Sequence, residues 1–205
     1  MRHALTFGSD STRHRTSEMT VPYWNAAGLL PPHDENNPVS NLRSPYLVTV
    51  ADLVARLTAT RQRRQIAEGF LRYRAGLHAL GFRTGFQWVD GSFCTDVETL
   101  EGRSPGDIDV VTFFETPIGM DRRAAFIAHP ELFITEESKR VFSCDAYIVD
   151  IKGSSPEFLI AASAYWSSVW GHTRGGVWKG FLQVNLDPEF DELARELLQV
   201  DEVAA

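Results

Sequence analysis

Cysteine is scarce in this sequence, and long apolar runs are missing. Only Cys94 and Cys144 occur among the 205 residues, which excludes a disulfide framework and a cysteine-based zinc motif. No apolar stretch approaches the length of a membrane span, and the N-terminus lacks the apolar core of a signal peptide. We therefore expect a cytoplasmic protein with reduced thiols and no membrane partner.

Positive charge is also in deficit, with 20 Lys and Arg against 27 Asp and Glu, a net charge of −7. This balance argues against bulk nucleic-acid binding. The charge is uneven, because seven arginines fall within residues 56–83, beside the single acid Glu68. Such a run is typical of a solvated helix face, and it leaves open a basic surface that holds a partner.

The length predicts one domain with a sizeable core. Residues 1–20 are polar and lack periodicity, so we predict a disordered N-terminal segment, with Met19 as a candidate start. We expect residues 21–205 to form the single domain.

The periodicity along that domain changes from helical to strand-like. A helical part is predicted at about 49–81, with Thr49 and Thr60 as caps and Gly81 at the end. The sheet core is predicted at about 86–186. Its strands are expected at 86–89, 107–114, 144–151 and 177–186. Helices are expected at 121–140, with a break at Pro130, and at 156–170.

The last helix is predicted at about 188–200, with Asp187 as its cap and Pro188 in first position. Its buried face is predicted to contain Phe190, Leu193, Ala194, Leu197 and Leu198. These elements indicate an α+β domain, with α/β as the alternative, built on one central mixed β-sheet flanked by helices.

Two acids stand at the start of an otherwise apolar strand, "DIDVVTFF". Side chains alternate along a strand, so Asp107 and Asp109 point the same way. Two carboxylates on a buried strand are costly unless they are paired or bind a metal ion. Mg²⁺ prefers carboxylates, water and phosphate oxygens. We interpret the pair as a metal site that awaits a phosphate ligand; the alternative is an acidic strand end in a surface turn.

Gly91 and Ser92 follow the first predicted strand. Glycine lets the backbone approach a ligand closely, and the Ser92 hydroxyl and amide suit a phosphate group. The neighbouring Asp90 we interpret as a turn or cap residue.

The order of strand, Gly-Ser, loop and strand with Asp-x-Asp over residues 86–114 resembles the polymerase-beta-like nucleotidyltransferase superfamily. The resemblance implies a nucleotidyltransferase-like fold, a Mg²⁺ or Mn²⁺ cofactor, and a third carboxylate on a later strand. The segment "CDAYIVDI" offers Asp145 and Asp150, which face opposite sides of a strand. We favour Asp145 and expect Asp150 to end the strand or cap the turn after it.

Residues 21–186 also resemble a narrower group, a bacterial family of unknown function with a nucleotidyltransferase-like fold. The segments that carry this resemblance are "PYWNAAGLLPP", "RSPYLVTVADLVARL", "RYRAGLHALGF", "QWVDGSF", "PGDIDVV", "CDAYIVD" and "TRGGVWKG".

A further candidate is "GHTRGGVWKGF", in which Arg174 and Lys179 flank a double glycine. Two cations on a glycine-rich turn suit a triphosphate. The alternative is an ordinary surface hairpin. The five tryptophans we interpret as core or loop residues rather than base-stacking platforms.

The resemblance implies a metal-dependent nucleotidyltransferase. Asp107, Asp109 and Asp145 would be catalytic metal ligands, and Gly91 and Ser92 would hold the terminal phosphates of a nucleoside triphosphate. The acceptor hydroxyl is expected on a protein, a tRNA or a small molecule. By analogy, small members of this superfamily serve toxin–antitoxin or phage-defence systems.

Two other readings stay open. One is a non-catalytic module that binds a nucleotide or a partner, and the other is a metal-dependent phosphohydrolase, which needs the same carboxylates.

Overall fold

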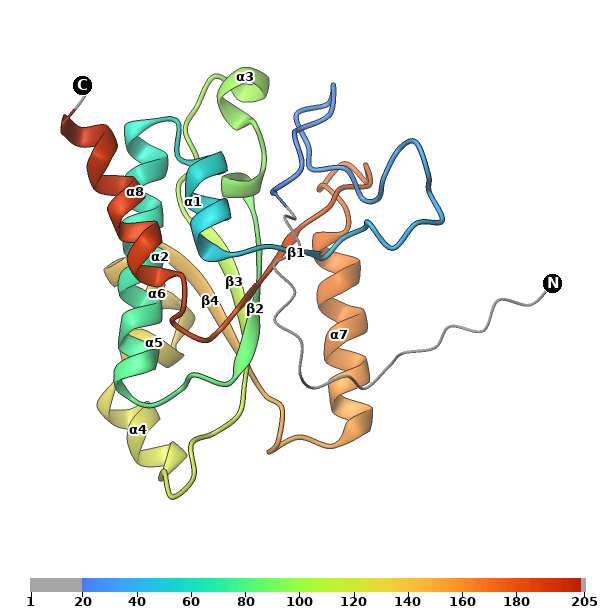
Figure 1. The fold of residues 1–205 in the computed structure, drawn as a ribbon. Helices are drawn as coiled ribbons and strands as arrows, with labels where there is room; N and C mark the ends of the chain where they lie inside the picture. The colour runs from blue at the N-terminus through green and yellow to red at the C-terminus, as the bar shows by residue number, and fades with distance from the viewer. Residues whose placement is uncertain (1–19, 204–205) are drawn as a thin grey trace.

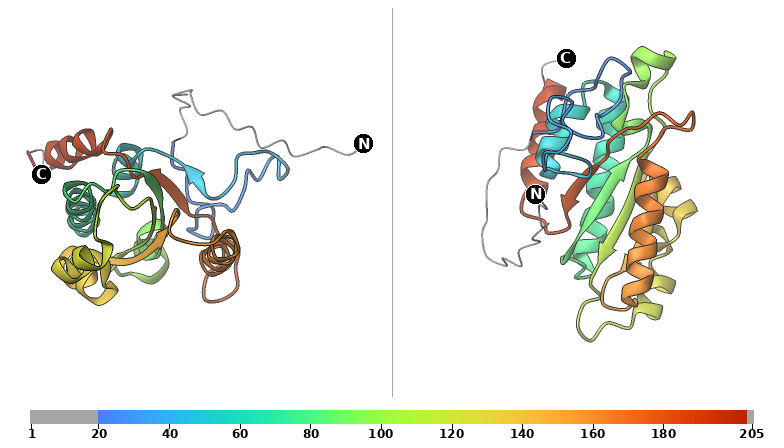
Figure 2. Two further views of the ribbon diagram at one scale, coloured as in Figure 1. Left: turned by 90° about the horizontal axis from the view of Figure 1, so that it is seen from below. Right: turned by 90° about the vertical axis from the view of Figure 1, so that its right-hand side faces the viewer.

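The computed structural model describes residues 20–203. They form an α+β architecture with one five-stranded mixed sheet, in the order β1-β5-β2-β3-β4, and with helices on both faces (Figure 1, Figure 2). The predicted α+β class with one mixed sheet is confirmed. The predicted disorder of residues 1–20 and the candidate start Met19 lie, except for Thr20, outside the described residues.

The strands are β1 (Tyr46–Leu47), β2 (Gly85–Asp90), β3 (Ile108–Phe114), β4 (Cys144–Asp150) and β5 (Leu182–Asn185). The helices are α1 (Val50–Leu57), α2 (Arg61–Ala79), α3 (Val97–Glu101), α4 (Arg122–Ala128), α5 (Pro130–Phe133), α6 (Thr135–Phe142), α7 (Pro156–Trp170) and α8 (Asp191–Val203), and a 3₁₀ helix, η1, spans Ser92–Cys94. No helix in this described part of the chain is long and apolar enough to cross a membrane.

The strand pairings set the geometry of the candidate site. β3 lies antiparallel to β2 and parallel to β4, while β5 lies antiparallel to β2 and parallel to β1. The carboxyl end of β2 therefore lies at the same edge of the sheet as the amino ends of β3 and β4.

Several helix ends are set by local chemistry, as predicted. Thr49 and Asp52 form a reciprocal capping box at the start of α1, and Thr60 accepts a hydrogen bond from the Arg63 amide at the start of α2. Gly81 follows α2 with φ of +91°, a conformation that favours glycine. The helix predicted at 156–170 is confirmed as α7.

One helix boundary and the burial of one residue were predicted wrongly near the C-terminus. The last helix begins at Asp191 rather than at Pro188, because the Asp187 side chain accepts a hydrogen bond from the Glu189 amide in a preceding turn. Leu193 was predicted on the buried face of this helix, but it is 46% exposed. Ala194 and Leu198 were predicted on the same face, and both are buried.

Two other elements differ in extent. The strand predicted at 177–186 is reduced to Leu182–Asn185, because Trp178 bridges to His172 and the Lys179 and Gly180 amides donate to the Gly171 and Leu30 carbonyls. The helix predicted at 121–140 divides into α4, α5 and α6, with extended backbone at Ile134 as well as a break before Pro130.

Apolar side chains pack on both faces of the sheet. One core lies between the sheet and α1, α2, α6 and α8, whereas α7 covers the other face. The residues buried on the α7 side are Trp88, Val111, Phe113, Val149, Trp170 and Phe181.

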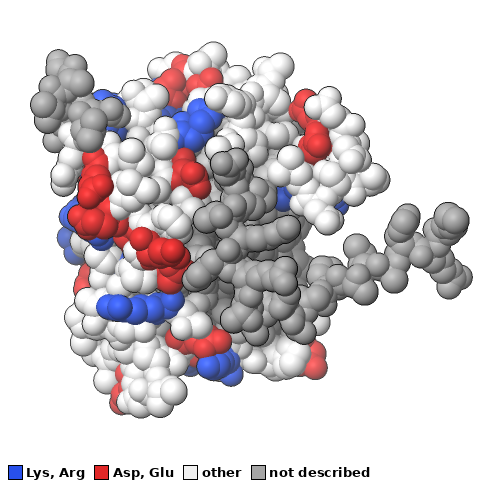
Figure 3. All heavy atoms as spheres, viewed as in Figure 1, with Lys and Arg blue, Asp and Glu red and all other residues white. Residues whose placement is uncertain are grey.

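The predicted solvated face of the arginine run is wrong for two of its members. Arg63 and Arg74 are each 1% exposed. Arg74 donates to Asp191 of α8 over 2.7 Å and to the Gln87 side chain, and so ties α8 to the core. On the face seen in Figure 3, acidic and basic side chains are interspersed among the described residues, without a continuous basic surface.

Candidate active site

A row of aspartates crosses the edge of the sheet at which β2 ends. Asp90 pairs in register with Asp109 across β2 and β3, and Asp109 pairs with Asp145 across β3 and β4. Asp107 stands just before β3. The structure thus brings together Asp107 and Asp109, which alternation along the strand placed on one face, and Asp145, which the resemblance favoured as the third carboxylate.

Asp109 lies at the centre of this row and has the most perturbed electrostatics of the aspartates in it. Burial, and after it the neighbouring carboxylates of Asp107, Asp90 and Asp145, together raise its pKa to about 7 against the opposing effect of Lys139. A carboxyl that holds its proton near neutral pH is poised to release it when a cation approaches.

Lys139 of α6 supplies the cation closest to the predicted acids. Its Nζ lies 2.6 Å from Oδ2 of Asp107 and 3.6 Å from Oδ2 of Asp145. The hydrogen bond to Asp107 raises the pKa of Lys139. The side chain is 52% exposed, so it can leave the acids without unpacking the core. Lys139 was not predicted as a site residue, because it is one of several charged positions on a short helix.

The interpretation of Asp90 as a turn or cap residue is wrong. It is the last residue of β2, it is 3% exposed, and both its oxygens accept hydrogen bonds from Nζ of Lys179. Burial raises the pKa of Asp90 to about 6 although the Lys179 ammonium opposes this shift. Lys179 is buried too, so it faces Asp90 rather than the solvent.

Arg174, the other predicted phosphate ligand in this segment, is exposed. It lies in a turn closed by a hydrogen bond from the Gly176 amide to the Thr173 carbonyl, and His172 and Trp178 form a β-bridge behind it. The segment is therefore a surface hairpin whose two cations are separated. Arg174 projects at the tip, and Lys179 is fixed beneath.

Gly91 has a physical reason to be glycine. Its φ is +85°, and a β-carbon placed on it would overlap Oδ2 of Asp109. The backbone after β2 thus passes directly against the central carboxylate. Ser92 follows as the first residue of η1, and no other described residue forms a hydrogen bond with its hydroxyl. The predicted phosphate-binding turn therefore begins against the central acid.

Arg63 holds this turn in place from α2. Its guanidinium donates to the carbonyls of Phe93 and Thr95 over 2.7 and 2.6 Å, and to both carboxylate oxygens of Glu98 over 2.8 Å. Sequence reasoning placed Arg63 on a solvated face. Its spacing from Ile66, three residues later on the buried stripe of α2, was the signal for burial.

The donor set fits a hard divalent cation in charge and ligand type. Asp107, Asp109 and Asp145 offer carboxylate oxygens only, which Mg²⁺ and Mn²⁺ prefer. As the side chains stand, no three His, Cys, Asp or Glu within residues 20–203 converge to hold a metal ion. The ammonium of Lys139 lies between Asp107 and Asp145, so a metal ion would have to replace it there.

Comparison with protein families identifies the family to which the chain belongs. The model of a family of unknown function, DUF6932, matches residues 22–185. The chain belongs to this family. No match was found among curated proteins or among solved structures. The family has no assigned activity, so the function of this DUF6932 protein must be argued from its site.

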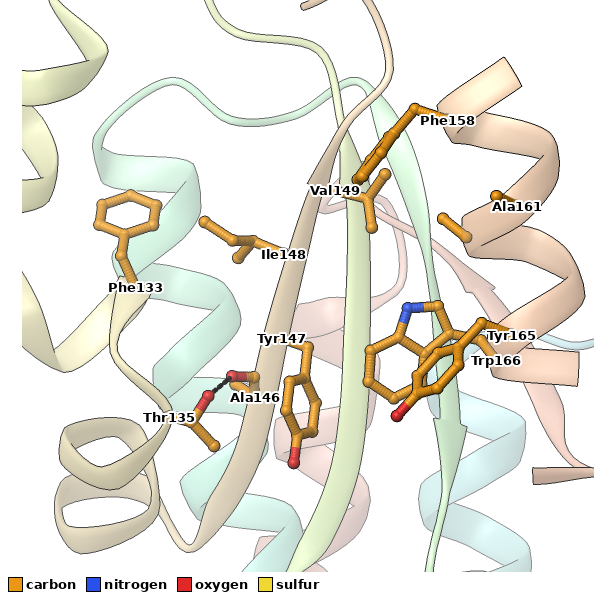
Figure 4. Close-up of a pocket in the computed structure, with 11 residues that line it drawn as sticks. Phe133, Thr135, Ala146, Tyr147, Ile148, Val149, Phe158, Ala161, Tyr165 and Trp166 are labelled. Atoms are coloured by element: carbon orange, nitrogen blue, oxygen red, sulfur yellow. Dashed lines mark hydrogen bonds between the residues drawn. The ribbon is translucent and has the colours of Figure 1, made fainter. Parts of the chain in front are cut away.

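A groove of about 510 Å³ opens beside the acid row of this DUF6932 protein, along β4 and α7 (Figure 4). Tyr147 lies on the same face of β4 as Asp145, and the Tyr147 and Trp166 rings pack with centroids 4.7 Å apart. Burial raises the pKa of Tyr147, and the carboxylates of Asp145 and Asp109 add to this effect. The lining residues are Phe133, Thr135, Ala146, Tyr147, Ile148, Val149, Phe158, Ala161, Ala162, Tyr165 and Trp166.

Proposed function

We propose that this DUF6932 protein is a metal-dependent nucleotidyltransferase that moves a nucleotide from a nucleoside triphosphate to an acceptor hydroxyl. One observation carries the proposal. Asp109 and Asp145 pair across β3 and β4, Asp107 stands just before β3, and the Gly91–Ser92 turn passes against Asp109, with the half-exposed Lys139 ammonium to offset the acids. The resemblance of residues 86–114 to the polymerase-beta-like superfamily supports the same assignment.

The residues divide into metal ligands and phosphate contacts. Asp107, Asp109 and Asp145 would hold Mg²⁺ or Mn²⁺, which when bound supplies charge neutralisation to the phosphates. Asp109 loses its proton as the substrate complex assembles. Ser92 presents a hydroxyl with no partner among the described side chains to the terminal phosphates, and Arg174 at its exposed turn is the second candidate contact.

Lys139 and Lys179 take different roles in this proposal. Lys139, once displaced from Asp107, contacts the phosphates from α6, because its half-exposed side chain is free to swing. Lys179 stays with Asp90 and acts as a positioning residue for the end of β2.

The reaction is an in-line displacement at the α-phosphorus. The acceptor oxygen forms a bond to phosphorus, the bond to the bridging oxygen breaks, and pyrophosphate leaves. The hydroxyl proton passes to Asp145 or to a water molecule beside it. Positioning and charge neutralisation supply most of the rate acceleration.

The test is incubation with α-labelled nucleoside triphosphates and Mg²⁺ or Mn²⁺, with host lysate and host tRNA as acceptors. The Asp107→Asn/Asp109→Asn protein is compared with Glu101→Gln/Glu192→Gln, which removes the same charge from exposed ion pairs. Label on a macromolecule with the native and control proteins, but not with the aspartate variant, supports the transferase. Label released only as free nucleotide indicates a hydrolase. Metal-dependent binding without turnover indicates a binding module.

A further inference from the structure

β4 is the edge strand next to the acid row. In the sheet order it pairs only with β3 among the named strands. The Ser143 carbonyl accepts from the Ile108 amide, and the Ile151 amide donates to the Phe114 carbonyl. Backbone groups alternate along a strand, so those of Cys144, Ala146 and Ile148 point away from β3.

Only part of this outer edge is capped. Ser138 donates to the Cys144 carbonyl over 2.9 Å. Thr135 donates to the Ala146 carbonyl over 2.8 Å, as Figure 4 shows. The backbone N–H and C=O of Ile148 have no partner among the described residues. An open strand edge of this kind is a template for another extended chain.

The groove runs along this open edge and has apolar walls. Phe158, Ala161 and Tyr165 of α7 lie on one side, and Phe133 and Thr135 lie on the other (Figure 4). Phe158 is 54% exposed and Tyr165 is 60% exposed, although both are large aromatic residues. Exposed apolar surface gathered in a groove marks a binding site. No charged residue lines it, so it lacks the cations that bind a nucleic-acid backbone.

If the proposed function holds, the position of the groove makes it the binding site of the acceptor. Gly91 and Ser92 lie at the end of β2, and Asp145 lies on β4, on the other side of Asp109. In an in-line displacement the attacking and leaving oxygens stand on opposite sides of the phosphorus. With pyrophosphate on the Gly91–Ser92 side, the acceptor enters from the β4 side.

We infer that the acceptor is an extended polypeptide segment that adds to the sheet beside β4. Its backbone pairs with the free groups of Ile148, and its apolar side chains enter the groove. The floor of the groove, residues 146–149, matches a segment of about four residues at roughly 3.3 Å per residue. A Ser, Thr or Tyr one step beyond this floor brings its hydroxyl to Asp145.

The test uses a displayed library of random heptapeptides, selected on the full-length protein without nucleotide or metal and counter-selected on Ala161→Trp. Each enriched peptide is synthesised in two forms. One form is N-methylated at every second backbone amide, and the other is N-methylated at the remaining amides. We expect one form to lose affinity about tenfold while the other binds as before, since only one set of amides faces β4. Ile148→Pro, which removes an outward N–H, should reduce binding similarly.

Ile160→Trp is the matched control, because Ile160 is on the same helix and 71% exposed but does not line the groove. It should bind peptide like the native protein, and circular dichroism confirms that each variant folds. Equal loss from both N-methylated forms, or no enrichment over Ala161→Trp, overturns the inference. It is also overturned if a single-stranded RNA, or a second copy of this chain, occupies the groove instead.

Peptide binding is measured without nucleotide, so a failure of this inference can be told apart from a failure of the proposed function. Transfer to another acceptor without any peptide binding removes this inference alone. Peptide binding without nucleotidyl transfer under any condition removes the proposed function and leaves a peptide-docking surface.

Discussion

At the residue scale, Asp109 makes the stability of the protein depend on pH. Its pKa is raised to about 7 by burial and by neighbouring carboxylates, against about 4 in an unfolded chain. Between these values the folded protein binds a proton that the unfolded chain releases. Stability therefore falls as pH rises through this window, and the loss is complete above about pH 7.

Asp109→Asn keeps the shape of the side chain and removes this titration. We expect its unfolding free energy without metal to exceed that of the native protein by about 1–2 kcal/mol at pH 8, and to match it near pH 4. Urea denaturation at several pH values measures this. Mg²⁺ at pH 8 should stabilise the native protein more than the variant. Equal stability at pH 8 would show that Asp109 ionises freely.

Lys139 competes with any cation for Asp107 and Asp145. Lys139→Gln should therefore bind Mn²⁺ about threefold to tenfold more tightly than the native protein, by titration without nucleotide. Lys152→Gln is the control, because Lys152 pairs with Glu115 and is similarly exposed at 67%. Weaker Mn²⁺ binding by Lys139→Gln would contradict this competition.

Substitution of Gly91 tests the contact between the turn after β2 and the Asp109 carboxylate. Gly91→Ala should lower the unfolding free energy by about 2–4 kcal/mol, because the added methyl overlaps the Asp109 carboxylate. Gly119→Ala isolates the backbone cost, since Gly119 has a similar φ of +79° and open space around it. It should lose only about 1 kcal/mol. Equal losses would show that Asp109 moves aside freely.

At the element scale, Arg63 joins α2 to the turn that carries Ser92. Arg63→Met should lower the unfolding free energy by about 3–5 kcal/mol, because it removes the partner of Glu98 and leaves two carbonyls without a donor. Hydrogen exchange should speed up at residues 91–101 and stay unchanged in β4. Arg72→Met, at an exposed position of the same helix, is the control. Uniform acceleration over the whole chain would mean that Arg63 does not act on this turn.

Elements with local signals could be predicted from the sequence. The capping box at Thr49, the cap at Thr60 and the glycine after α2 depend on neighbours within a few residues. The burial of Asp191 at the start of α8 could not be predicted, because it depends on Arg74, 117 residues away. The two-residue strand β1 was missed for the same reason, since it exists only through pairing with β5.

At the scale of the whole molecule, alternation along one strand and the superfamily resemblance predicted which acids meet, but neither predicted their partners. Asp107 and Asp109 share one face because side chains alternate along a strand, whereas Asp145 was chosen from the resemblance and joins them because β4 pairs in register with β3. The pairing of Asp90 with Lys179 joins residues 89 positions apart, and Lys139 reaches the acids from another helix. Such contacts depend on the tertiary fold, and they revise the roles assigned to Asp90 and Lys179.

The most direct test of the account is the binding of a nucleotide at the acid row. Non-hydrolysable analogues of the four nucleoside triphosphates are titrated calorimetrically into the native and Asp107→Asn/Asp109→Asn proteins, with and without Mn²⁺. The account predicts that at least one analogue binds with a Kd below about 1 mM. This binding should need Mn²⁺ and be lost in the variant. Failure of all four analogues to bind, or binding that survives both changes, would contradict the account.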